Sequence, residues 1–211
     1  MAGSPPVRLF CATSNPGKLR EFRLAAGEDI HIEALPAVLC PEDGATFEQN
    51  AISKALCHGR AALANAALSR ERPLYVFADD SGIEVDALGG DPGVRSARFS
   101  GPDATALANN RLLLERLRGL PDAERSARFV CVIALTRDGE LVKTFHGTAE
   151  GRILEAAAGS GGFGYDPLFF YPPLSGSFGE LPDEQKWAHS HRGKAFRRML
   201  EWLRSGRQAL L

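Results

Sequence analysis

Two adjacent carboxylates, Asp79 and Asp80, follow the apolar run 74–78, and this placement favours a site for a divalent cation. Neighbouring anions repel each other unless a cation or hydrogen-bond donors offset their charge, and Mg²⁺ prefers oxygen ligands with few protein carboxylates. Successive strand side chains point to opposite faces, so at most one of the two carboxylates is expected to face the site. Ser81 and Gly82 are expected to end the strand in a sharp turn, and an acidic turn that only caps the strand is the alternative.

A polar turn ahead of a helical stretch offers a candidate phosphate site. Its residues are Thr13, Ser14, Asn15, Pro16, Gly17 and Lys18. Free backbone N–H groups and the helix dipole favour an anion at such an N-terminus. The turn is not a Walker A loop, because Ala12 stands at the first glycine position and Leu19 replaces the hydroxyl residue that would meet magnesium. The alternative is a structural turn shaped by Asn15 and Pro16, with Lys18 solvated.

A glycine-rich segment late in the chain matches the dinucleotide fingerprint as Gly159-x-Gly161-x-x-Gly164. Tyr165-Asp166-Pro167 follows where a Rossmann helix should begin, and no βαβ unit surrounds the motif, which argues against a nicotinamide enzyme. The segment 163–166 is more typical of a binding wall, where glycine allows close approach and an aromatic ring covers a base. A tight structural turn is the alternative.

Hydrogen-bond donors also gather at the start of the final amphipathic stretch, in the segment 190–194, with Lys186 just upstream. Purine carbonyls accept such donors, whereas a capped helix with solvated charges is the alternative. His189 and His191 form no zinc site, because nothing nearby supplies the remaining ligands.

The elements that must position these groups alternate between strand and helix patterns. Strands are predicted at 7–12, around Ile30 and Ile32, at 74–78, and as a hairpin of 127–136 and 141–147 around Asp138-Gly139. Helices are predicted after Pro16, after Thr46 with Gln49 as its capping-box partner, after a cap at Asp103, and over Phe196 to Leu203. This order predicts an α/β domain with a mixed sheet.

Length and charge limit the function classes. The chain has 211 residues, with 25 Lys+Arg against 26 Asp+Glu, so it lacks the positive excess that drives nucleic-acid binding. A single domain over 1–211, of one or two lobes, is expected, with a flexible N-terminus at 1–6. The four cysteines are expected to be reduced, with Cys11 and Cys131 inside buried strands. No apolar run approaches membrane-spanning length and no signal peptide is evident, so we expect a cytoplasmic protein without a membrane partner.

Several segments together resemble the Ham1/inosine-triphosphatase family of nucleoside triphosphate pyrophosphatases. They are Thr13-Ser14-Asn15-Pro16-Gly17-Lys18, Thr46-Phe47-Glu48-Gln49-Asn50-Ala51, Ala78-Asp79-Asp80-Ser81-Gly82, Pro92-Gly93, Ser96-Ala97-Arg98-Phe99, Gly161-Gly162-Phe163-Gly164-Tyr165-Asp166-Pro167 and Ser190-His191-Arg192-Gly193. Their order and spacing span nearly the whole chain.

The resemblance implies a fold, a reaction and residue roles. The fold would be an elongated mixed sheet flanked by helices, with two lobes, a central nucleotide-binding cleft and a homodimer. The reaction would hydrolyse ITP, dITP or XTP to monophosphate and pyrophosphate with Mg²⁺. Residues 13–18 would hold the phosphates, Asp80 would be proton acceptor and magnesium ligand, and Ser81 would touch the nucleotide. The base and sugar would be enclosed by Phe163, Gly164, Tyr165, Asp166, Lys186, His191 and Arg192.

One departure from the family pattern concerns the metal. The family usually has a magnesium-binding glutamate where this sequence has Gln49, and Glu48 points about 100° away on a helix. Gln49 offers only a neutral oxygen, so we expect weaker metal binding, with Asp79 as a further candidate ligand. A nucleotide-binding module that has lost catalysis and a Maf-like pyrophosphatase for modified pyrimidines are the alternatives.

Overall fold

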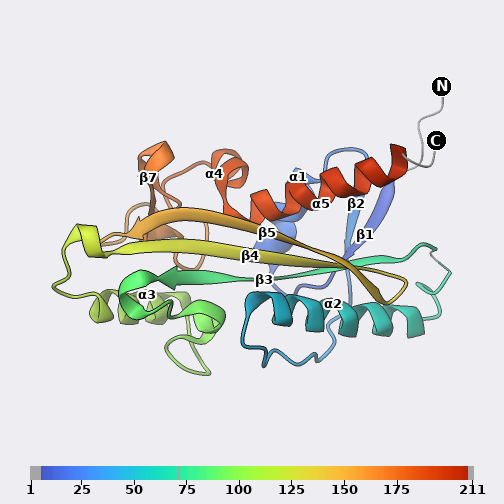
Figure 1. Cartoon of the computed structure of the whole chain (residues 1–211), viewed down its shortest axis with the longest axis horizontal. Helices are drawn as coiled ribbons and strands as arrows, with labels where there is room; N and C mark the ends of the chain where they lie inside the picture. The colour runs from blue at the N-terminus through green and yellow to red at the C-terminus, as the bar shows by residue number, and fades with distance from the viewer. Residues whose placement is uncertain (1–5, 71, 209–211) are drawn as a thin grey trace. The chain divides into compact units, whose positions relative to one another are not determined.

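The computed structural model describes residues 6–70 and 72–208 (Figure 1). Its strands and α-helices are β1 (Val7–Cys11), α1 (Pro16–Ala25), β2 (Ile30–Ala34), α2 (Phe47–Ala64), β3 (Tyr75–Val85), α3 (Ala106–Arg116), β4 (Ser126–Arg137), β5 (Glu140–Ile153), β6 (Phe169–Tyr171), β7 (Gly176–Ser177), α4 (Asp183–His189) and α5 (His191–Gln208). Of the predicted flexible segment 1–6, residues 1–5 lie outside the described part of the chain. Among the described helices, none is long and apolar enough to cross a membrane.

The strands form one mixed sheet in the order β2-β1-β3-β4-β5-β6-β7. β1 pairs in parallel with β2 and β3, whereas β5 pairs antiparallel with β6. Asp138 and Gly139 connect β4 to β5 with positive φ at both positions, which a two-residue type I′ hairpin turn requires. The predicted α/β class, mixed sheet and hairpin are therefore confirmed.

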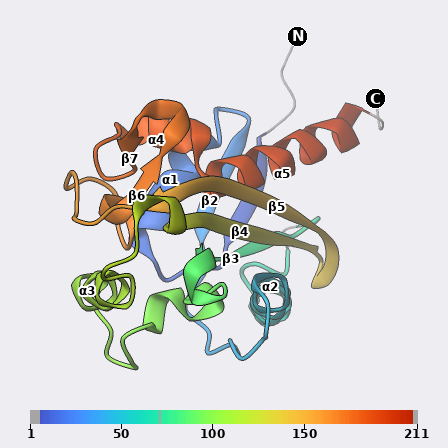
Figure 2. The ribbon, with the colours of Figure 1, turned by 60° about the vertical axis from the view of Figure 1, so that its left-hand side comes forward.

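The chain divides into two compact units, each with its own apolar core. Unit 1 comprises the described residues of Met1–Asp80, Val132–His146 and Ala195–Leu211, and unit 2 comprises Ser81–Cys131 and Gly147–Lys194. In unit 1, the rings of Phe22, Phe77 and Phe196 pack with centroids 4.9 to 5.9 Å apart. Within this unit, α2 and α5 cover opposite faces of the strands (Figures 1 and 2). The core of unit 2 includes Leu113, Leu117, Phe129, Phe169 and Phe178.

The turn predicted directly after the two carboxylates is wrong. β3 continues without interruption to Val85, so Asp79 and Asp80 lie in the middle of a strand. Gly82 instead lets Ser96 and Gly93 lie close to the backbone of β3. A Cβ atom at this position would collide with Ser96 Oγ and the carbonyl oxygen of Gly93.

Side-chain caps fix where three helices begin. Asn15 caps α1, and Thr46 caps α2 as predicted, accepting from the N–H of Gln49. The predicted cap at Asp103 is wrong, because Thr105 caps α3.

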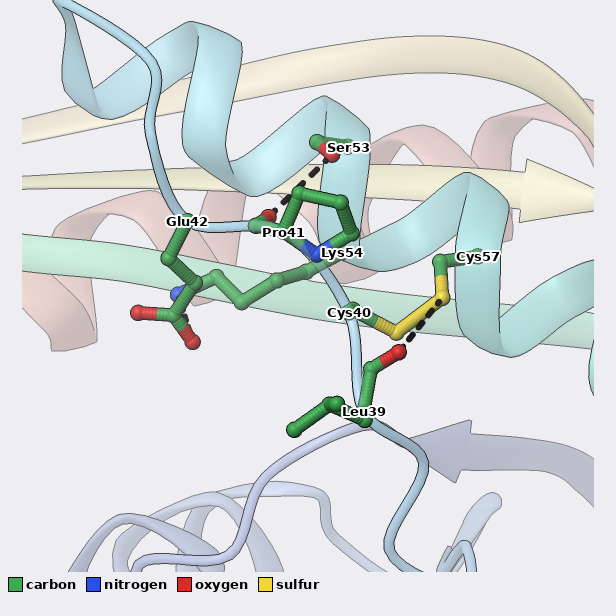
Figure 3. The surroundings of a disulfide bond; sticks show 7 residues. All are labelled: Leu39, Cys40, Pro41, Glu42, Ser53, Lys54 and Cys57. Atoms are coloured by element: carbon green, nitrogen blue, oxygen red, sulfur yellow. Dashed lines mark hydrogen bonds and ion pairs between the residues drawn. A yellow bond between two sulfur atoms is a disulfide. The ribbon is translucent and has the colours of Figure 1, made fainter.

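The prediction of four reduced cysteines is wrong for two of them. Cys40 and Cys57 form a disulfide that joins the loop before α2 to the helix itself, with Cα atoms 6.0 Å apart (Figure 3). Cys11 and Cys131 are buried thiols, as predicted. The spacing of Cys40 and Cys57 matches no known motif. Their pairing could not be predicted from the sequence, because it depends on the loop folding back along the helix.

Candidate active site

Asp80 projects from β3 with both carboxylate oxygens held by side chains of α2. Oδ1 accepts a hydrogen bond from Lys54 Nζ at 3.1 Å, and Oδ2 accepts one from Asn50 Nδ2 at 3.1 Å. The two donors are four residues apart, so they lie on the same face of the helix. An ionised carboxylate has roughly four lone-pair sites, so capacity remains to accept a hydrogen bond from water. Asp80 is therefore fixed in direction by two donors from one helix.

Lys54 is held as a cation in this arrangement. Burial opposes its charge, but the carboxylates of Asp80, Asp79 and Glu42 outweigh that effect and raise the pKa of Lys54 above its usual value. Its Nζ lies 3.8 Å from Glu42. Sequence reasoning missed both Lys54 and Asn50. Their four-residue spacing after the Thr46 cap was the available signal, but nothing in the sequence shows that this helix face meets β3.

Asp79 and Lys18 form a nearly buried ion pair beside Asp80. Lys18 Nζ lies 2.8 Å from Asp79 Oδ2, and the Asp79 side chain is only 1% exposed. The two neighbouring carboxylates thus have different lysine partners, as the alternation of strand side chains predicts. Lys18 is not the solvated lysine of the structural alternative. The pairing favours Asp79 as the residue that positions the Lys18 ammonium group.

The turn 13–18 is organised by Asn15. Its Oδ1 accepts from the N–H groups of Gly17 at 2.9 Å and Lys18 at 3.2 Å, and its own N–H donates to Thr13 Oγ1 at 3.2 Å. Pro16 occupies the start of α1. Ser14, Asn15 and Pro16 are exposed, so the turn is accessible to a ligand. Asn15 and Pro16 therefore shape the backbone, and phosphate binding at this turn stays a prediction.

Gln49 and Asp80 are the two residues expected to bind magnesium through their side-chain oxygens. Gln49 Oε1 accepts from the N–H of Ala45 at 2.8 Å, so this side chain takes part in capping α2, one residue upstream of a standard capping box. Residues 6–70 and 72–208 contain no group of three or more acidic, histidine or cysteine side chains that could hold a metal. One carboxylate and one amide fit Mg²⁺ only with phosphate oxygens and waters as the other ligands, which is how Mg²⁺ usually binds at nucleotide sites.

A second polar group lies in unit 2 around the ring of Phe163. Lys186 and Asp166 form a buried ion pair at 2.7 Å, with side chains only 3% and 4% exposed. Asp166 Oδ2 also accepts from the N–H of Phe163 at 2.7 Å. Lys186 Nζ and Arg192 Cζ lie 4.9 and 5.3 Å from the ring centroid, within cation–π range. The ring is thus fixed by an anchored backbone and by two cations.

Arg192 also holds Ser81, another residue of unit 2. Its Nη2 donates to Ser81 Oγ at 2.9 Å. The ring of His191 is buried and stacks on Phe129 at 4.6 Å, with the planes 7° apart. The structure therefore brings Ser81, Phe163, Asp166, Lys186 and Arg192 together in unit 2, as it brings Lys18, Asp79 and Asp80 together in unit 1.

Two predicted base-binding residues have structural partners. Tyr165 is buried and its hydroxyl donates to the carbonyl of Ser96 at 2.8 Å. Burial raises the pKa of this phenol, so it remains protonated. The carbonyl of Gly164 accepts from Asn110 Nδ2 at 3.0 Å. These contacts hold the loop in shape, and contact with a nucleotide stays a prediction for both residues. A short 3₁₀ turn rather than an α-helix follows the GxGxxG letters.

His58, one turn after Lys54 on α2, gives a pH prediction. Burial, followed by the charge of Lys54, lowers the pKa of His58 from its ordinary value of 6.5. The unfolded chain therefore binds this proton first as the pH falls, and the folded state loses stability through pH 6.5 and below. We expect the Tm of the wild-type protein to decrease from pH 7.5 to 5.5, and the Tm of His58→Gln to decrease less over the same range. Thermal unfolding followed by circular dichroism checks this, and an equal decrease in both proteins would contradict it.

These features define a class, an α/β protein with a positioned carboxylate in unit 1 and an aromatic ring held among cations in unit 2. The model of the Ham1 family matches residues 9–202. The chain is 44% identical over 204 residues to a Thermus thermophilus protein named dITP/XTP pyrophosphatase, covering 95% of this chain and 93% of that protein. A Geobacter sulfurreducens protein of the same name is 46% identical over 198 residues, covering 90% and 92%.

Solved structures agree with this relationship. The Ham1 protein of Staphylococcus aureus superposes with a TM-score of 0.80 at 35% identity, covering 95% of this chain and all of that one. A structure from Mycobacterium abscessus, described as a nucleoside-triphosphatase and dITP/XTP pyrophosphatase, gives 0.68 at 38% identity, covering 92% and 99%. The chain belongs to the Ham1 family, which confirms the resemblance seen in its motifs.

Proposed function

We propose that this chain is a nucleoside triphosphate pyrophosphatase that converts ITP, dITP and XTP to the monophosphate and pyrophosphate. Relatives named dITP/XTP pyrophosphatase match nearly its full length at 44% to 46% identity. The observation that carries the proposal is the Asp80 carboxylate, which Lys54 and Asn50 hold from two sides. The activity is that of a hydrolase of nucleotide metabolism, acting on the bond between the α- and β-phosphates.

The chemistry assigned to unit 1 is general-base hydrolysis. Asp80 orients a water and accepts its proton as the water attacks the α-phosphorus. Lys18, positioned by Asp79, offsets negative charge on the departing pyrophosphate. The turn 13–18 receives the phosphate chain at the N-terminus of α1. Asp80 and Gln49 would hold a Mg²⁺ ion, which would supply further charge neutralisation on the phosphates.

Recognition of the base is assigned to unit 2. Phe163 offers a ring surface for a purine, and Arg192 offers N–H donors that a 6-carbonyl accepts. The 6-amino group of adenine is itself a donor, so adenine would leave these donors without acceptors. Ser81 orients Arg192 through its hydroxyl.

A substrate panel tests the proposal. Purified protein is incubated with Mg²⁺ and ITP, dITP, XTP, ATP, GTP or modified pyrimidine triphosphates, and the products are separated by ion-exchange chromatography. Monophosphate and pyrophosphate from the first three are expected. Nucleoside diphosphate and orthophosphate as products would contradict the proposed reaction. Preference for modified pyrimidines would establish the Maf-like alternative, and binding without turnover would establish a nucleotide-binding module without catalysis.

The proposal includes Mg²⁺ as cofactor, a homodimer and a cytoplasmic location, with small-molecule triphosphates as substrates. The family resemblance supports the first two. The balanced charge of the chain gives no support to a nucleic-acid partner. Loss of turnover with a chelator and its recovery with Mg²⁺ test the cofactor, and light scattering tests the dimer.

Gln49→Glu is expected to lower the magnesium concentration needed for half-maximal rate by about threefold or more. The change adds a negative charge to the ligand set, and Mg²⁺ affinity rises with ligand charge. The new carboxylate can still accept from the Ala45 N–H, so the start of α2 should be kept. Initial rates across a magnesium titration measure this. Gln49→Ala serves as the control, and an unchanged half-maximal concentration in Gln49→Glu would rule out a metal role.

A further inference from the structure

The loop 36–45 runs along α2 and is tied to it at several points (Figure 3). Besides the disulfide between Cys40 and Cys57, the carbonyl of Pro41 accepts from Ser53 Oγ at 3.3 Å. The Glu42 carboxylate lies 3.8 Å from Lys54 Nζ. The loop therefore contacts the lysine that holds one oxygen of Asp80.

The end of the same loop contacts the other residue that holds Asp80. The N–H of Gly44 donates to Asn50 Oδ1 at 2.8 Å. Because this oxygen is committed to the loop, the amide nitrogen of Asn50 is turned toward Asp80 Oδ2. Gly44 is needed for the close approach, since a Cβ atom there would lie 2.7 Å from Asn50 Oδ1. Both side chains that orient Asp80 are thus themselves held by the loop.

We propose that Cys40 and Cys57 form a reversible redox modification site that sets the turnover rate by fixing this loop. The inference rests on the proposed function. Both cysteines are partly exposed and open to a reductant, whereas Cys11 and Cys131 are buried. A dithiol reduces the pair by thiol–disulfide exchange. The S–S bond accepts two electrons and two protons to give two thiols, and the dithiol becomes a cyclic disulfide.

Reduction removes the covalent tether and leaves weaker contacts. The Glu42 side chain is 50% exposed, so its ion pair with Lys54 is screened by water. The loop opens more often, and Asn50 and Lys54 then hold Asp80 less firmly. We expect kcat to decrease about 3-fold to 30-fold, the range typical of coupling through packed contacts, with KM changing little. Oxidising conditions would restore the rate.

A measurement independent of catalysis tests the tether. After oxidation, two of the four cysteines should react with a thiol reagent in denaturant, and all four should react after a dithiol. Hydrogen exchange at the N–H groups of Gly44 and Ala45, which donate to α2 side chains, should become faster on reduction. Four reactive thiols in the oxidised sample, or unchanged exchange, would overturn the proposal.

Activity measurements then test the regulatory consequence. Pyrophosphate release from ITP is followed for the oxidised, reduced and reoxidised protein, with Cys40→Ser/Cys57→Ser as the matched control. The double variant should have the reduced protein's kcat and no response to dithiol, and circular dichroism checks that it is folded. Equal kcat in both redox states of the wild type would overturn the proposal even if the variant fails to fold. If neither state hydrolyses any triphosphate, the proposed function fails, while thiol counts and hydrogen exchange still report on the tether.

Discussion

Asp80→Asn is expected to lower kcat for ITP about 10²-fold to 10⁴-fold, the usual worth of a general base. The amide keeps the shape of the carboxylate but cannot take a proton from the attacking water. At saturating Mg²⁺, KM for ITP should change much less, because the turn 13–18 and the Phe163 group do not include this residue. Steady-state kinetics with pyrophosphate detection measure both quantities. A variant with kcat within about threefold of wild type would remove Asp80 from the mechanism.

The surroundings of Asp80 call for a matched control in this experiment. Asn50 donates to Oδ2 and Lys54 donates to Oδ1, so an amide at position 80 places one N–H₂ group against a donor. Part of the rate loss in Asp80→Asn would then come from this contact between two donors. The exchanged pair Asp80→Asn/Asn50→Asp restores a donor opposite an acceptor, and the carboxylate introduced at position 50 can still accept from the N–H of Gly44. The exchanged pair should stay as inactive as Asp80→Asn; recovery of the rate would show that hydrogen-bond misfit, not loss of the base, caused the defect.

Local patterns in the sequence predicted those parts of the fold that depend on neighbouring residues. Thr46 caps α2, and Asp138-Gly139 turns the hairpin, because each feature is decided within a few residues. The turn after the acidic pair was mispredicted because Ser81-Gly82 looks like a turn in isolation. In the folded chain, Gly82 instead gives Ser96 room to approach.

The candidate site shows the same division between local and distant contacts. The resemblance identified Asp80, but the residues that orient it are 26 and 30 positions away in the chain, on a helix packed against β3. No periodicity shows which face of α2 meets which strand. Likewise, Lys18 and Asp79 were predicted separately for phosphate and metal, and their pairing at 2.8 Å joins residues 61 positions apart. Side-chain partners of this kind depend on tertiary packing rather than on local sequence.

Discrimination between ITP and ATP should reach about 10⁴-fold in kcat/KM, the scale at which a site built of hydrogen-bond donors rejects a base that lacks the acceptor. Arg192 is the donor best placed for the 6-carbonyl. Lys186 is committed to the buried Asp166 carboxylate, and the ring of His191 is stacked on Phe129. A guanidinium carries five N–H groups in a planar fork, and Nη2 of Arg192 donates to Ser81.

Arg192→Met therefore tests where the discrimination originates. It keeps an unbranched apolar chain beside Phe163 and removes every donor, so kcat/KM for ITP should decrease about 10-fold to 100-fold, the usual worth of a charged hydrogen bond. The kcat/KM for ATP should change little, because adenine offers no acceptor at that position. The ratio of kcat/KM for ITP to that for ATP therefore decreases. Ser81→Ala is the matched control, since it removes the partner of Arg192 but leaves the guanidinium in place, and it should narrow the ratio less. If wild-type protein hydrolyses ATP as efficiently as ITP, or if Arg192→Met lowers kcat/KM equally for both substrates, Arg192 is not the residue that distinguishes the 6-carbonyl.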